Sequence, residues 1–347
     1  FSFCRTMVGW IPGGLGHTNV FASIIFAGMS GAAVADAGGL GLVELKAMKD
    51  GGYDDDFSLA VTAASSIIGP IIPPSIPAVL FGVVSGVSVG RLFVAGIIPG
   101  LLIGLTEALM VYFYAKRRNY PCDPKPTVKQ IAYSCKTAVF PLLTPVIIIG
   151  GMMMGVFTPT EAAAVAVLYA TVLGLVSREL RAAEIPGILL ETARSTIVIL
   201  FIAGCANIFG YIITTMQIGP ITAAWFTANI HSTYLTMFLI FLLLMVMGCF
   251  MDSAAAIFIL VPVLLPVVKA VGIDPVYFGL VFILTLMLGL ITPPVGMVLY
   301  VLSNVSGVPF TRIAKATVPY VLVLCVLVLI FIFVPSIVTF LPNLVFG

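Results

Sequence analysis

Gly69-Pro70-Ile71-Ile72-Pro73-Pro74 recurs, 220 residues later, as Gly289-Leu290-Ile291-Thr292-Pro293-Pro294. Glycine, isoleucine and the Pro-Pro pair stand at the same offsets in both stretches. A Ser-Gly-Val triplet follows each of them, at Ser85 and at Ser306. Because proline has no N–H for the carbonyl four residues back, each stretch is expected to interrupt a helix. The chain therefore contains two helix breaks at corresponding places.

The composition is that of a protein that crosses a membrane several times. The 347 residues are 61% hydrophobic and 9% charged, with a mean hydropathy of +1.21. No soluble domain has this balance. There is no basic patch with interleaved aromatic residues, which argues against nucleic acid as a partner. Two histidines offer little material for a histidine-based metal or catalytic centre.

A helix that crosses a membrane needs about 20 apolar residues, and the segments of this length predict an all-α, polytopic membrane protein. Two further regions have apolar arms of about 15 residues, which is too short for a crossing. We expect these regions to be re-entrant hairpins that dip into the membrane and return, at 16–43 and 233–268. The expected single helices are 93–114, 138–157, 160–177, 195–215 and 317–341, and the expected broken helices are 57–83 and 275–303.

The placement of basic residues predicts the orientation. The loop 115–137 holds six Lys and Arg residues and one acid, so it is expected in the cytoplasm. Counting crossings from there places fourteen of the sixteen basic residues inside, with only Arg91 and Lys269 outside. The same count opens the two hairpins to opposite sides.

The halves 1–137 and 138–347 are therefore predicted to be inverted repeats, an organisation found in many transporters. The second hairpin has three helices before it and the first has almost nothing. Since the chain also begins at Phe1 without methionine, we expect N-terminal sequence upstream.

Backbone oxygens freed at the two breaks predict cation sites. A carbonyl without a partner is costly in hydrocarbon, and Na⁺ prefers oxygen ligands. Hydroxyl groups stand beside both breaks and at the hairpin tips. We therefore predict two Na⁺ sites, each built from one tip and one break, at Ser30, Gly31, Ser65, Ser66, Gly69, Pro70, Pro73, Asp252, Ser253, Gly289, Leu290 and Thr292. The predicted substrate contacts are Ser30, Ser75, Asp252, Ser253, Thr292 and Pro293.

Four acids lie in or near apolar runs, where acids are functional candidates. Asp252 is the best placed of them, at a hairpin tip. For Asp36 a hydrogen bond within the hairpin and a role in the site are equal alternatives. Glu161 follows Thr158 and Pro159 and is expected to cap a helix. Glu107 has no evident partner.

An alternative comes from Gly28-Met29-Ser30-Gly31, which contains the G-x-S-G motif of rhomboid intramembrane serine proteases. That chemistry requires a base within hydrogen-bond reach of Ser30. Neither His17 nor His231 is expected on a helix that faces this serine. A channel is a further alternative, but no ring-forming filter motif is found.

Five stretches carry a resemblance to a known family, at residues 28–36, 63–77, 95–100, 157–164 and 289–296. Through them, and over essentially its whole length, the chain resembles the large membrane subunit of the tripartite ATP-independent periplasmic (TRAP) transporters. The family often has Ser-Gly-Ser at the first tip, whereas this chain has Ser30-Gly31-Ala32, which would remove one ion ligand.

The resemblance implies Na⁺-driven import of organic anions, commonly carboxylates such as C4-dicarboxylates or sialic acids. It implies two partners, a soluble periplasmic substrate-binding protein and a small four-helix membrane subunit. It also implies a location in the bacterial inner membrane and an elevator mechanism. In that mechanism the hairpins and broken helices slide against a scaffold of the other helices. The protein is then a transporter and not an enzyme.

Overall fold

In a computed structural model, residues 1–230 and 232–347 are described, and they form helices without any β-strand. Seven helices in this part of the chain are long and apolar enough to cross a membrane. The prediction of an all-α polytopic membrane protein is confirmed. These helices are α7 (Val89–Arg118), α8 (Val128–Met153), α9 (Pro159–Val176), η2 (Ala182–Glu184) continuing into α10 (Ile185–Thr215), α12 (Thr233–Phe250), α13 (Ser253–Ala270) and α16 (Phe310–Phe333).

The chain begins with α1 (Ser2–Val8) and then turns back on itself at Gly31. α2 (Gly14–Ser30) runs to this turn, where Gly31 has φ +64°, and α3 (Ala33–Ala35), η1 (Asp36–Leu40) and α4 (Gly41–Asp50) follow. α2 packs against η1 and α4. Because glycine adopts positive φ without steric cost, Gly31 allows the reversal. We call residues 30–33 the first tip.

Both Pro-Pro stretches interrupt helices, as their sequence predicts. The first break is residues 67–75, between α5 (Asp55–Ser66) and α6 (Ile76–Ser85). The second break is residues 291–296, between α14 (Pro275–Leu290) and α15 (Met297–Ser306). The Pro73–Pro74 and Pro293–Pro294 peptide bonds are both cis. The first break ends where the Ser75 Oγ accepts a hydrogen bond from the Ala78 N–H at 3.1 Å and caps α6.

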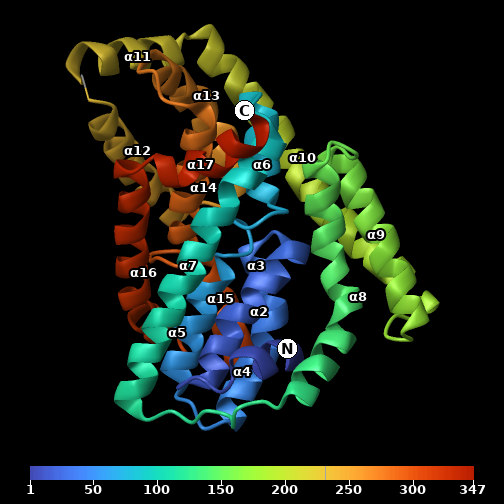
Figure 1. The fold of residues 1–347 in the computed structure, drawn as a ribbon. Helices are drawn as coiled ribbons and strands as arrows, with labels where there is room; N and C mark the ends of the chain where they lie inside the picture. The colour runs from blue at the N-terminus through green and yellow to red at the C-terminus, as the bar shows by residue number, and fades with distance from the viewer. Residues whose placement is uncertain (231) are drawn as a thin grey trace.

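The second helix pair, α12 and α13, meets at Met251-Asp252, which we call the second tip. Each helix has 18 residues, which is more than the 15 or so expected and enough to cross a membrane by length. Length therefore does not distinguish a crossing from a return at this tip. Figure 1 shows α2 and α4 at one end of the molecule and α11 (Ile218–Asn229), α12 and α13 at the other.

The structure differs from the sequence-based expectation at the C-terminus. A single helix was expected over 317–341, but α16 ends at Phe333 and α17 (Ser336–Phe346) follows. The cause is Pro335, because the residue before a proline is driven out of the helical region. Val334 accordingly has φ −125° and ψ 72°. α10 is also longer than the expected 195–215, since it begins at Ile185 directly after a turn.

The helix at the centre of the core is α14, which is buried along its entire length after Pro275. It packs against α7, α12, α13 and α16. α8, α9 and α10 lie outside this core and expose most of their apolar side chains. Figure 1 shows α8 and α9 standing apart from the N-terminal and C-terminal helices. The molecule thus has a packed helical body and a flank of exposed apolar helices.

Three ion pairs join segments that were all predicted to face the cytoplasm. Arg118 Nη1 lies 3.0 Å from Asp54 Oδ2, and Arg312 Nε lies 2.6 Å from Asp56 Oδ1. Arg5 binds Asp123 through two bonds of 2.7 and 2.8 Å. These contacts place the start of the chain, the start of α5, the end of α7 and the start of α16 at one end of the molecule.

The Arg5–Asp123 pair is expected to make a small, acid-sensitive contribution to stability. The hydrogen bond from Arg5 lowers the pKa of Asp123 from its ordinary value of 3.8. A lowered folded-state pKa gives stability above the unfolded value, and this stability is lost as the pH falls through the folded value. Because the pair is partly exposed, Asp123→Asn should cost at most about 1 kcal/mol at neutral pH. Thermal melts in detergent should show a difference from the parent at pH 7 that closes below pH 4.

Candidate functional site

The first tip touches the first break. The Ile76 N–H donates to the Gly31 carbonyl at 3.3 Å. A Cβ on Gly31 would lie 2.6 Å from the Pro74 carbonyl oxygen, and one on Gly69 would lie 3.7 Å from Ala32. Backbone of the tip and backbone of the break are therefore in direct contact, with no side chain between them.

The backbone just before the second tip contacts the second break. The Val295 N–H donates to the Cys249 carbonyl at 3.2 Å. Gly248 of α12 and Gly289 of α14 face each other so closely that a Cβ on Gly289 would overlap the Gly248 backbone. In each half, a residue at the C-terminal end of the break thus bonds a carbonyl at or just before the tip. The pairing of each tip with its own break was predicted from the sequence.

The two halves also interlock, which the sequence did not reveal. α3 and η1, just after the first tip, pack against α15 of the second broken helix. α13, just after the second tip, packs against α6 of the first broken helix. Gly38 and Gly41 lie at this contact, where added Cβ atoms would be at ordinary van der Waals distances of 3.4 Å from Val301 and 3.8 Å from Leu302. The segment after each tip therefore packs against a broken helix of the other half.

Half of the carbonyls predicted to be free have partners within the protein. The Ser66 carbonyl accepts from the Gly69 N–H at 3.3 Å, and the Gly289 carbonyl accepts from the Thr292 N–H at 3.1 Å. The Pro70 carbonyl accepts from the Ser75 hydroxyl at 2.5 Å. In the described chain, the carbonyls of Gly69, Pro73 and Leu290 receive no hydrogen bond. The prolines remove the helical partner of these six carbonyls, and tight turns and Ser75 give three of them a new partner.

The hydroxyl groups beside the breaks donate to nearby oxygen atoms. Thr292 Oγ1 donates to the Leu288 carbonyl at 2.7 Å, and Ser66 Oγ donates to the Ala63 carbonyl at 2.8 Å. A hydroxyl that donates its hydrogen keeps lone pairs that can face a cation. Ser65 instead turns toward α2, where its Oγ donates to Asn19 Oδ1 at 2.7 Å. Asn19 Nδ2 in turn donates to Thr62 Oγ1 at 2.8 Å.

A cavity of about 330 Å³ opens at the first tip. Ser30, Gly31, Pro74 and Ser75 line it, together with apolar side chains from α7, α8 and α9. The Ser30 hydroxyl is buried and has no hydrogen-bond partner among the described residues. Because buried hydroxyl groups are normally paired, Ser30 is a donor and acceptor available to a bound molecule.

The other predicted residues lie apart from this cavity. Pro73 faces a small apolar hollow against Phe93 and Phe346. Asp252 caps α13, with Oδ2 accepting from the Ala254 N–H at 2.8 Å. Ser253 begins that helix beside it, and Pro293 is exposed at the second break. The first tip is thus part of a cavity shared with helices outside its own half.

The acids in or near apolar runs have different environments. Glu161 forms the expected cap, with its carboxylate accepting from the Thr158 N–H at 2.7 Å. Asp36 and Glu107 are buried, and none of their carboxylate oxygens has a hydrogen-bond partner in the described chain. The hydrogen bond considered for Asp36 is therefore not found. Glu44 is also fully buried, and its place in an ordinary-looking Leu-Val-Glu-Leu stretch gave no signal of this.

Asn19 is the residue of this region that the sequence analysis missed. The only signal was an amide in an apolar helix, and its partners lie more than 40 positions away. We expect Asn19→Ala to destabilise the protein by about 1–3 kcal/mol, because it leaves Ser65 and Thr62 buried without their partner. Asn207→Ala is the matched control, since Asn207 is exposed on α10 and bonds only its own helix. Equal melting temperatures for the two variants would contradict this role.

Among the described residues, no side chain forms a hydrogen bond with the Ser30 hydroxyl and could serve there as the base of a protease. His17 stands 13 residues earlier on the same helix, which separates the two by about 20 Å at 1.5 Å per residue. His231 lies outside the described residues. The geometry that would support the alternative from the G-x-S-G motif is therefore not found at His17.

An all-helical membrane protein with two interrupted helices, each met by the tip of a helix pair, has the architecture of a secondary transporter. Comparison with known families agrees. The chain belongs to the family described as the tripartite ATP-independent periplasmic transporter, DctM component, which it matches over residues 1–337. It is a multi-pass protein of the bacterial inner membrane and a permease component rather than an enzyme, which removes the protease alternative.

Three relatives illustrate the match. The sialic acid TRAP transporter large permease protein of Vibrio cholerae is 46% identical over 100% of this chain and 82% of its own length. The sialic acid TRAP transporter permease protein of Haemophilus influenzae is 42% identical over 99% of this chain, which spans 56% of that relative. The C4-dicarboxylate TRAP transporter large permease protein of Pseudomonas aeruginosa is 36% identical over 98% of this chain and 80% of its own length.

Proposed function

We propose that this chain is the Na⁺-coupled permease subunit of an importer of organic anions. The observation that supports it best is the direct contact of each tip with one break, which gathers backbone and hydroxyl oxygens at two places. Intramembrane backbone of this kind is tolerated only where protein buries it or where it lines a cavity. Bound cations would satisfy the oxygens that remain unpaired.

The two proposed Na⁺ sites follow from the oxygens at each contact. The first uses the first tip with Ser66 and the Gly69 carbonyl. The second uses the second tip with Thr292 and the Leu290 carbonyl. Ser65 and Pro70 are weaker candidates than the sequence suggested, because Asn19 and Ser75 engage them. With Ala32 at the first tip, the ligands there come from Ser30 and backbone atoms.

The proposed substrate site is the cavity that contains Ser30 and Ser75. It lies at the N-terminus of α6, where the positive end of the helix dipole favours an anionic group. The relatives are named for sialic acid, C4-dicarboxylates and 2,3-diketo-L-gulonate, all of which are organic acids. An organic anion is therefore the proposed substrate class.

We further propose inverted repeats at 1–137 and 138–347 and an elevator motion. The reciprocal packing of each post-tip segment on the other half's broken helix supports a single moving unit. α8, α9 and α10 would belong to the scaffold, because the body covers little of their surface. Each uncompensated positive charge carried inward gains about 2.3 kcal/mol per 100 mV.

The proposed partners are a small four-helix membrane subunit and a periplasmic substrate-binding protein, as the tripartite family name suggests. The exposed apolar face of α10 is a suitable surface for the membrane subunit. Its Ile197, Leu200 and Phe201 are each more than 60% exposed.

Uptake by proteoliposomes that contain the chain and both partners tests the proposal. Labelled sialic acid and labelled succinate serve as probe substrates. Uptake of at least one should require external Na⁺, stop when choline replaces it, and depend on the binding protein. Equal uptake in Na⁺ and choline would contradict Na⁺ coupling.

A further inference from the structure

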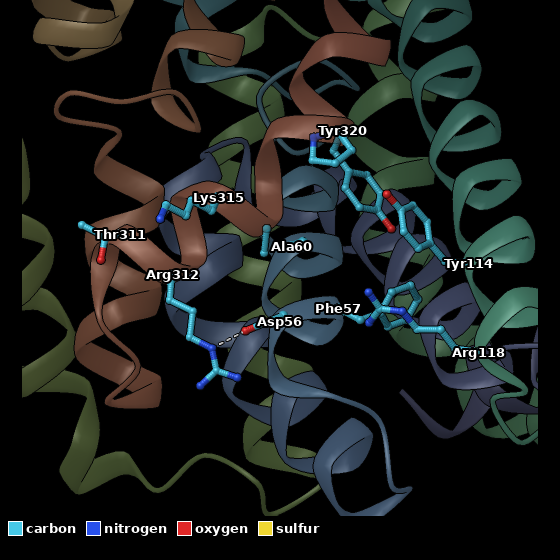
Figure 2. Close-up of a pocket in the computed structure, with 11 residues that line it drawn as sticks. Asp56, Phe57, Ala60, Tyr114, Arg118, Thr311, Arg312, Lys315 and Tyr320 are labelled. Carbon is cyan, nitrogen blue, oxygen red and sulfur yellow. Dashed lines mark hydrogen bonds and ion pairs between the residues drawn. The ribbon is translucent and has the colours of Figure 1, made fainter.

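A second cavity, far from the tips in sequence, lies between the ends of α5, α7 and α16. Its volume is about 470 Å³, which is larger than that of the cavity at the first tip. Figure 2 shows its lining, with Arg118 on one side and Arg312 and Lys315 on the other. It lies at the end of the molecule where the ion pairs gather, which the basic residues assign to the cytoplasm.

The charges that line this cavity do not cancel. The Asp56 carboxylate pairs with Arg312 Nε, and Arg118 pairs with Asp54 outside the lining. Lys315 has no ion-pair partner among the described residues. The lining holds one acid, Asp56, and three basic residues, Arg118, Arg312 and Lys315, so it carries an excess of positive charge. Arg312 bonds Asp56 through Nε alone, so its two Nη groups remain available as donors to a ligand.

The inner wall of the cavity supplies a neutral donor. Phe57, Ala60 and Tyr320 are buried there. The Tyr320 hydroxyl is buried and has no hydrogen-bond partner in the described part of the chain. The ring lies against Tyr114, with centroids 6.1 Å apart and planes 13° apart, so packing fixes its position. Figure 2 shows the two rings side by side. An orphan buried hydroxyl is unusual and indicates a missing partner.

We propose that this cavity binds a phosphate group at the cytoplasmic membrane surface. A phosphate oxyanion would accept from the Tyr320 hydroxyl and from Lys315 and Arg312, and it would neutralise the excess charge. The group has two sources, the headgroup of an anionic phospholipid or a soluble phosphate ester. The apolar residues Phe57, Ala60 and Pro319 suit the first carbons of the acyl chains of a lipid, while the cations suit either source.

Binding to the purified chain in detergent tests this proposal. The probes are dioctanoyl phosphatidylglycerol, glycerol 3-phosphate and, as the phosphate-free comparison, dioctanoylglycerol. We expect saturable binding of a phosphate probe that is weakened about tenfold by Lys315→Gln and severalfold by Tyr320→Phe. Both variants preserve packing, and their melting temperatures without ligand verify that they fold. Lys129→Gln removes an exposed lysine of α8 outside the cavity and should leave binding unchanged.

The possible outcomes distinguish the two sources of the phosphate group and also test whether the cavity binds phosphate at all. Binding of phosphatidylglycerol alone indicates a lipid headgroup, and comparable binding of glycerol 3-phosphate indicates a soluble ester. The proposal is overturned if neither phosphate probe saturates, if dioctanoylglycerol binds equally well, or if Lys315→Gln and Tyr320→Phe bind like the parent.

Discussion

Gly289→Ala is expected to reduce transport at least tenfold and to lower the stability of the protein by about 2–3 kcal/mol. A Cβ at this position would meet the Gly248 backbone, with the Cα atom only 2.6 Å away. Overpacking in a well-filled core costs about 1–3 kcal/mol, and here the obstacle is backbone that cannot rotate aside. α12 and α14 would have to separate, which moves the second tip away from the second break.

The control is Gly210→Ala on α10. This glycine is also within a membrane helix, but an added Cβ there would meet no atom within 4 Å. Alanine at Gly210 should leave the melting temperature and uptake unchanged or slightly improved, because alanine has the higher helix propensity. If Gly289→Ala transports as well as Gly210→Ala, close contact between this tip and this break is not needed.

Thr292→Val is expected to raise the Na⁺ concentration for half-maximal uptake about tenfold. Valine keeps the shape of threonine but removes the oxygen that lies at the second break, where it bonds the Leu288 carbonyl. Loss of one ligand worth about 1.4 kcal/mol corresponds to a tenfold weaker affinity. Uptake at saturating Na⁺ should fall much less than uptake at low Na⁺.

Thr317→Val supplies the matched comparison. Thr317 is buried in α16, and its hydroxyl bonds the Ile313 carbonyl at 2.9 Å, as Thr292 does with its own helix. It lies on α16, outside both breaks and both tips, and is not a proposed ligand. An unchanged Na⁺ dependence in Thr292→Val, or the same shift in Thr317→Val, would remove Thr292 from the ion site.

Much of the architecture could be predicted from local chemistry. The Pro-Pro stretches predicted both breaks because the loss of an N–H acts within one turn of the helix. Thr158, Pro159 and Glu161 predicted a helix start, because capping also acts within a single turn of the helix. Prolines alone were less informative at the C-terminus, where Pro319 stays within α16 but Pro335 ends it. Tertiary contacts decide which prolines a membrane helix tolerates.

The site was harder to predict because its partners come from distant parts of the chain. No local signal indicates that Ser65 turns to Asn19, or that Ser75 takes the Pro70 carbonyl. The sequence showed which carbonyls lose their helical partner, but only the folded turn shows which find a new one. The packing of each half on the break of the other half likewise depends on contacts between remote segments.

The most direct test of the central claim is a Na⁺ titration of the purified chain's thermal stability in detergent. If Na⁺ binds only the folded state, it stabilises that state by RT ln(1 + [Na⁺]/Kd). We predict that the melting temperature rises with Na⁺ along this curve and does not rise with K⁺ or choline at equal ionic strength. The same melting temperature in Na⁺, K⁺ and choline at every concentration would contradict the claim that the tips and breaks form cation sites.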